Sequence, residues 1–134
     1  MGTQEVRLLV RTYAAITVGG ALGAICRFLI TNWAAGRWGT DFPYGTFMLN
    51  VSGSFAIGCI ATILTQRGVT DPVWRLLLIT GFLGAYTTFS AFTYDSLTLI
   101  TTGAVFKSLV NMAGSVLVGM VAVALGVLAG RLLA

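Results

Sequence analysis

The stretch GFLGAYTTFSAFTY, residues Gly81–Tyr94, departs furthest from the pattern of a plain membrane-spanning helix, although it lies within a long hydrophobic segment. Its glycines and its threonine pair, Thr87 and Thr88, weaken a helix, since glycine and β-branched residues form helices less readily than alanine or leucine. A backbone break at membrane depth is tolerated only where protein or a polar cavity satisfies the freed polar groups. The stretch is therefore either an ion or substrate site or a kinked structural helix whose hydroxyls bond to the preceding turn.

The composition around this stretch is that of an integral membrane protein. Of the 134 residues, 57% are hydrophobic and 9% are charged, which is too little charge to solvate a soluble fold. Several hydrophobic runs approach the ~20 residues that cross a bilayer as a helix. We predict one all-α transmembrane domain over residues 1–134, with four spans at about 8–33, 44–66, 73–95 and 104–132.

The few charges are spread over predicted loops and helix ends. The formal net charge of +4 forms no basic cluster, so we expect no nucleic-acid partner. Five arginines fall on the predicted side of the N-terminus, namely Arg7, Arg11, Arg67, Arg75 and Arg131. Arg37 and Lys107 fall on the opposite side. This small excess of positive charge on one side favours a cytoplasmic N-terminus.

Small residues recur at four-residue spacing within the predicted spans. The pairs are Gly19 with Gly23, Ser54 with Gly58, Ser115 with Gly119, and Gly126 with Gly130. Such spacing permits close approach of helix backbones in lipid, although glycine is also common in membrane helices for compositional reasons. Taken together, the pairs favour a compact and oligomeric bundle.

Two phenylalanines follow the threonine pair. Phe89 and Phe92 are three residues apart and share a helix face. A phenyl ring has a positive edge, so ring edges can line the path of an anion without a fixed charge. Thr88, Ser90 and Thr93 add hydroxyl donors nearby. The alternative is that the two rings only pack against neighbouring helices.

Asn50 is a primary amide within the otherwise apolar second span, and Thr46 lies one turn before it. An amide offers two donors that can replace part of the hydration shell of an anion. The alternative is a hydrogen bond between helices that serves assembly only.

Further polar positions lie on the fourth and first spans. Ser108, Asn111 and Ser115 form a stripe on one face of the fourth span, which is either a packing seam or a wall of the same pathway. Arg27, on the first span, either extends its charge to the interface or attracts anions at a vestibule.

The predicted spans contain no histidine, and we expect no Asp or Glu in their interiors. Without these groups there is no acid–base pair for catalysis and no proton-coupling group. We therefore expect no enzyme but a passive pathway for an anion. Two rival interpretations are a small multidrug exporter, which needs a membrane glutamate absent from the first span, and a structural subunit without transport.

The chain resembles the Fluc (CrcB) family of microbial fluoride channels over nearly its full length. The blocks that carry the resemblance are GGALGAICRF at 19–28, PYGTFMLNVSGSF at 43–55 and GFLGAYTTFSAF at 81–92. The resemblance implies a fluoride-selective channel that passively exports toxic fluoride. It also implies an antiparallel, dual-topology homodimer with two pores, placed as a multi-pass protein in the cell inner membrane.

The same resemblance implies roles for particular residues. Phe89 and Phe92 are similar to the phenylalanines whose ring edges face fluoride, and Asn50 is similar to the pore amide. Gly84 and Thr87 match positions whose backbone carbonyls hold a structural sodium ion between the subunits. Carbonyl oxygens are suitable ligands for a small alkali cation.

Two positions depart from the family pattern. Ala85 stands where the family often has a second glycine, and Ala91 stands where it often has threonine. The first adds a Cβ beside the expected ion-binding turn, and the second removes a hydroxyl near the phenyl rings.

Overall fold

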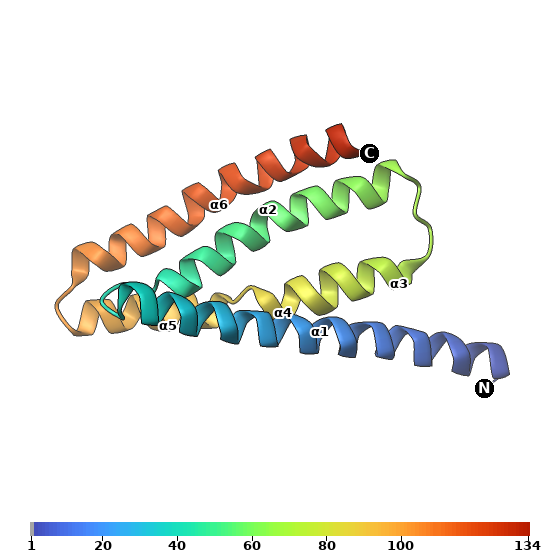
Figure 1. Ribbon diagram of the computed structural model, residues 1–134, viewed down its shortest axis with the longest axis horizontal. Helices are drawn as coiled ribbons and strands as arrows, with labels where there is room; N and C mark the ends of the chain where they lie inside the picture. Colours follow the sequence, from blue (N-terminus) through green and yellow to red (C-terminus); the bar gives the residue numbers. More distant parts are fainter. Residues whose placement is uncertain (1) are drawn as a thin grey trace.

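The computed structural model describes residues 2–134, and its long helices run side by side in alternating directions (Figure 1). The helices are α1 (Thr3–Trp38), α2 (Tyr44–Gln66), α3 (Pro72–Arg75), the π-helix η1 (Leu76–Leu83), α4 (Gly84–Tyr86), α5 (Phe89–Thr101) and α6 (Val105–Leu133). Elements α3 to α5 follow one another as a single bent span, Pro72–Thr101. With α1, α2 and α6 this makes four helices long and apolar enough to cross a membrane, which confirms the predicted all-α membrane fold.

The third span begins at a well-formed cap. The carboxylate of Asp71 accepts a hydrogen bond from the amide of Val73 at 3.0 Å, and Pro72 occupies the first turn. This bond, supported by the nearby Arg11 guanidinium at 2.9 Å, lowers the pKa of Asp71 below its ordinary value. The cap therefore stays charged at neutral pH and ties the start of the third span to α1.

The third span also runs further than its sequence suggested. We expected a loop from about residue 95, but α5 continues to Thr101 because Ser96 and Leu99 are buried. Asp95 consequently lies inside a span, so the expectation of no acidic residue in any span interior is wrong.

Glycines allow the helices to approach closely, as the small-residue spacing predicted. A Cβ on Gly23 would collide with the carbonyl oxygen of Phe82 in η1. Likewise, a Cβ on Gly126 of α6 would collide with the carbonyl oxygen of Phe55 in α2. These contacts set α1 directly against η1 and α6 directly against α2.

The variant Gly23→Ala tests this packing. Because backbone atoms of η1 cannot move aside cheaply, we expect a loss of about 1–3 kcal/mol in the free energy of unfolding. Denaturation of the purified protein in detergent measures it. Gly20→Ala is the matched control on the same helix, since the nearest atom to its Cβ would be the carbonyl oxygen of Gly81 at 4.0 Å. Equal stability of the two variants would contradict the account.

Candidate functional site

The helix break lies at Thr87 and Thr88, within the stretch that the sequence singled out. Thr87 has φ −82° and ψ 158°, and Thr88 has φ −152° and ψ 121°, so both residues are extended. The helix stops at Tyr86 and a new one starts at Phe89. The backbone polar groups of Thr88 therefore need partners from elsewhere in the protein.

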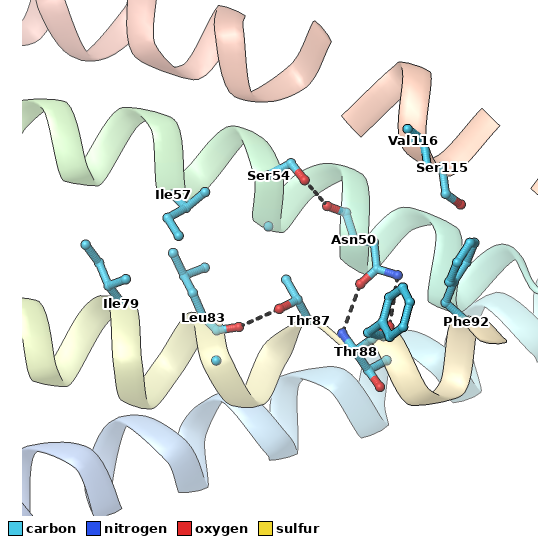
Figure 2. A pocket seen from close by; sticks show the side chains of 13 residues that line it. Asn50, Ser54, Ile57, Ile79, Leu83, Thr87, Thr88, Phe92, Ser115 and Val116 are labelled. Atoms are coloured by element: carbon cyan, nitrogen blue, oxygen red, sulfur yellow. Dashed lines mark hydrogen bonds between the residues drawn. The ribbon is translucent and has the colours of Figure 1, made fainter. Parts of the chain in front are cut away.

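Asn50 of α2 supplies both partners (Figure 2). The backbone amide of Thr88 donates to Asn50 Oδ1 at 2.9 Å, and Asn50 Nδ2 donates to the Thr88 carbonyl at 3.1 Å. A backbone amide can only donate and a carbonyl can only accept, so these two bonds fix the orientation of the side-chain amide. One of the two donors of Asn50 is thus committed to the break, and one N–H remains for another ligand.

The same arrangement leaves backbone carbonyls at the end of α4 without their usual donors, and those of Gly84 and Thr87 are among them. In a continuous helix the carbonyl of Gly84 would accept the amide of Thr88, which here donates to Asn50. The carbonyl of Thr87 would accept the amide of Ala91, which here donates to Thr88 Oγ1 at 3.2 Å. Gly84 and Thr87 are the positions that the sequence resemblance connected with a cation. Freed carbonyl oxygens are suitable ligands for an alkali ion.

A pocket of about 400 Å³ opens beside the break between α2, the third span and α6. Its lining residues are Asn50, Gly53, Ser54, Ile57, Ile79, Leu83, Gly84, Thr87, Thr88, Phe89, Phe92, Ser115 and Val116. Figure 2 shows Asn50 and Thr88 meeting at the break, with Phe92 and Ser115 nearby. The structure therefore brings seven of the residues selected from the sequence to one place.

The two phenyl rings stand at the start of α5. Their centroids are 5.7 Å apart and their planes are tilted by 39°. The ring of Phe89 is 76% exposed in the single chain, whereas Phe92 is half-buried. The first amides of α5 carry the positive end of the helix dipole, which favours an anion near these rings. The pocket thus offers positive ring edges and amide donors without a formal charge.

Thr46 and Ser108 lie outside this pocket. Thr46 is buried and donates to the carboxylate of Asp95 at 2.7 Å, in a separate pocket of about 220 Å³. Ser108 is fully buried and donates to the Ser96 carbonyl at 2.8 Å. Both hydroxyls are therefore engaged in contacts between helices. For Ser108, this agrees with the packing alternative for the stripe on α6.

Ser90 and Arg27 are also absent from the lining. The hydroxyl of Ser90 is exposed and lies 3.3 Å from that of Thr88. Arg27 is half-buried on α1, one turn after Gly23, which faces η1 and α4. No contact in the pocket assigns either residue a role there.

The stripe on α6 ends in two unusual buried atoms. Ser115 lines the pocket, but its hydroxyl oxygen is buried and has no partner among the described residues 2–134. Asn111 is fully buried and donates to Ser96 Oγ at 2.9 Å, while its Oδ1 has no partner within the same part of the chain. Ser115 therefore needs a change of rotamer before its hydroxyl can reach a ligand in the pocket.

Sequence reasoning missed several residues of the site. Ser54, Ile57 and Gly53 line the pocket from α2, yet only Ser54 stood out, as a packing residue. Their position one and two turns after Asn50 could have indicated a shared face. Asp95 was missed because the predicted third span ended at about residue 95, whereas α5 continues to Thr101.

The fold and the site define a class: a small multi-span membrane protein with a broken helix beside an uncharged pocket. The family model described as "CrcB-like protein, Camphor Resistance (CrcB)" matches residues 14–127. This chain belongs to the CrcB family.

Several known proteins are similar to this chain in sequence over most of their length. The protein of Acidobacterium capsulatum is 43% identical over 119 residues, covering 89% of this chain and 95% of its own. The Solibacter usitatus protein is 44% identical, covering 89% and 98%, and that of Chloroflexus aurantiacus is 46% identical, covering 87% and 93%. Each of these relatives is named fluoride-specific ion channel FluC.

Asn50→Ala tests the double hydrogen bond at the break. It removes both hydrogen bonds that hold the backbone of Thr88 in its extended form, so we expect a loss of roughly 1–3 kcal/mol in the free energy of unfolding. Ser54→Ala is the matched control, because Ser54 lies one turn further and its hydroxyl donates to the Asn50 carbonyl of its own helix at 2.7 Å. Denaturation in detergent compares the two. A loss no larger for Asn50→Ala than for the control would show that the double bond does not hold the break.

Proposed function

We propose that this chain is a fluoride-selective channel that lets toxic fluoride leave the cell passively. The observation that carries the proposal is the pocket at the broken third helix, where Phe89, Phe92 and the start of α5 meet an amide of Asn50. Fluoride is small and strongly hydrated, so its path needs several donors in place of water. Donors without charge bind weakly enough for the ion to leave again. The names of the relatives support fluoride as the ion.

The working unit in this proposal is an antiparallel, dual-topology homodimer with two pores, in the cell inner membrane. The pocket supports a second copy because it is open in the single chain, with the ring of Phe89 76% exposed. Another chain set against this face would complete the wall of a narrow track. A narrow track would exclude chloride, which is larger than fluoride.

A structural sodium ion completes the proposed unit. The carbonyls of Gly84 and Thr87 are suitable ligands for it. The amides that would bond them in a continuous helix donate instead to the side chains of Asn50 and Thr88. When bound, such an ion would balance the negative ends of these carbonyls and join the two subunits. The Ala85 and Ala91 departures leave these backbone groups unchanged, and Ala91 still donates its amide to Thr88.

One finding favours a proton-coupled exporter as the second candidate. Asp95 places a carboxylate in the third span, where the sequence interpretation expected none. However, this carboxylate accepts a hydrogen bond from Thr46 in the smaller pocket, and Asp95 does not line the larger one. The channel proposal therefore agrees better with the composition of the larger pocket.

Ion efflux from liposomes tests the channel proposal. The purified protein, reconstituted in the presence of sodium, should release fluoride rapidly and retain chloride. Phe89→Leu should slow fluoride efflux by roughly tenfold, about 1.4 kcal/mol in the barrier, because it removes the ring edge.

Phe106→Leu is the control for this measurement. Phe106 lies on α6 and is 77% exposed but does not line the pocket, so its variant should conduct like the unchanged protein. Absence of fluoride efflux, or equal passage of chloride, would refute the proposed function. Equal rates for the two phenylalanine variants would refute the assignment of Phe89.

A further inference from the structure

Tyr86 is the last helical residue before the break, and it is anchored twice. Its ring stacks on that of Phe82, with centroids 5.6 Å apart and planes inclined by 13°. Its hydroxyl lies 2.9 Å from Ser52 Oγ on α2. Ser52 already donates its proton to the Met48 carbonyl at 2.6 Å, so the phenol must be the donor between the two hydroxyls. Tyr86 therefore links the end of α4 to α2 by a directed hydrogen bond.

Gly53 lies next to Ser52 and lets α2 approach the break. A Cβ at this position would collide with the γ-methyl group of Thr87, and it would lie 3.5 Å from Cδ1 of Tyr86. With no side chain in between, α2 contacts the broken segment directly. Its residues 50–54 then hold the segment on both sides: Ser52 bonds Tyr86 before the break, and Asn50 bonds Thr88 after it.

The carbonyls freed by the break include those of Gly84 and Thr87, on either side of Tyr86. If Tyr86 could rotate with the end of α4, these oxygens would lose their fixed directions. Fixed oxygens bind a small cation better, because less ordering is needed when the ion arrives.

We propose that Ser52 and Tyr86 are positioning residues for an alkali cation at the carbonyls of Gly84 and Thr87. Their hydrogen bond fixes the end of α4 so that the two oxygens stay directed at one ion. This inference rests on the sodium ion of the proposed function, and it assigns to two further side chains a control over the affinity for that ion. Neither side chain touches the ion itself.

The test uses Tyr86→Phe, which keeps the ring stack and loses only the hydroxyl, together with Ser52→Ala and the double variant. Fluoride efflux is measured against sodium concentration, with N-methyl-D-glucamine replacing sodium at constant ionic strength. We expect each single variant to need roughly tenfold more sodium for half-maximal efflux, while the rate at saturating sodium stays close to that of the unchanged protein. The double variant should match the singles, because all three remove the same bond.

Tyr94→Phe is the control, since Tyr94 is 71% exposed on α5 and lines no part of the pocket. The rise in melting temperature with sodium is recorded on the same proteins in detergent, so the cation site is measured even without ion flux. The inference would be overturned if Tyr86→Phe and Ser52→Ala needed the same sodium concentration for half-maximal efflux as the unchanged protein. It would also be overturned if the melting temperature of the unchanged protein did not rise with sodium. A chain that binds sodium but passes no fluoride would refute the channel alone and leave this inference standing.

Discussion

The structure depends on the hydrogen bonds by which Asn50 satisfies both backbone polar groups of Thr88 inside the membrane. Without water to bond them, such groups cost several kcal/mol each when unpaired, as a general estimate for the bilayer interior. The side-chain amide of Asn50 is suited to this task because it combines an acceptor and a donor in one plane. By taking up the amide of Thr88 it also prevents the helix from closing, and so it leaves the carbonyl of Gly84 free. The close contact of α2 with the broken segment at Gly53 then becomes possible.

A broken helix offers two ends of opposite polarity at one depth in the membrane. The end of α4 presents carbonyl oxygens, which suit a cation, whereas the start of α5 presents amides and the positive edges of phenyl rings, which suit an anion. This explains how an uncharged pocket can serve a small anion without trapping it. It also explains why the sodium and fluoride functions proposed for this chain would depend on the same few residues. Ser52 of α2 bonds Tyr86 at the carbonyl end of the break, and Asn50 of the same helix bonds Thr88 at the amide end.

Much of this site could be predicted from the sequence, because breaks and polar groups stand out against an apolar background. The glycines and paired threonines marked the break, and Asn50, Phe89 and Phe92 all line the resulting pocket. Hydroxyls were harder to place, since a serine or threonine in a membrane helix bonds whichever acceptor is nearest. The hydroxyls of Thr46 and Ser108 donate to acceptors on α5 that lie away from the pocket. Asp95 was misread because its helix continues to Thr101, past the predicted end of the span at about residue 95. No pattern in the sequence indicated the π-helix before the break.

Whether Asn50 holds the break can be tested by an experimental structure of the Asn50→Leu variant in lipid, at a resolution that shows the backbone of residues 83–92. Leucine is close in size to asparagine but can form neither hydrogen bond to Thr88. We expect the amide of Thr88 to return to the carbonyl of Gly84, so that the helix runs without interruption through Thr87 and Thr88. An unchanged extended backbone at these two residues would contradict it, and would show that the break is held by something other than Asn50.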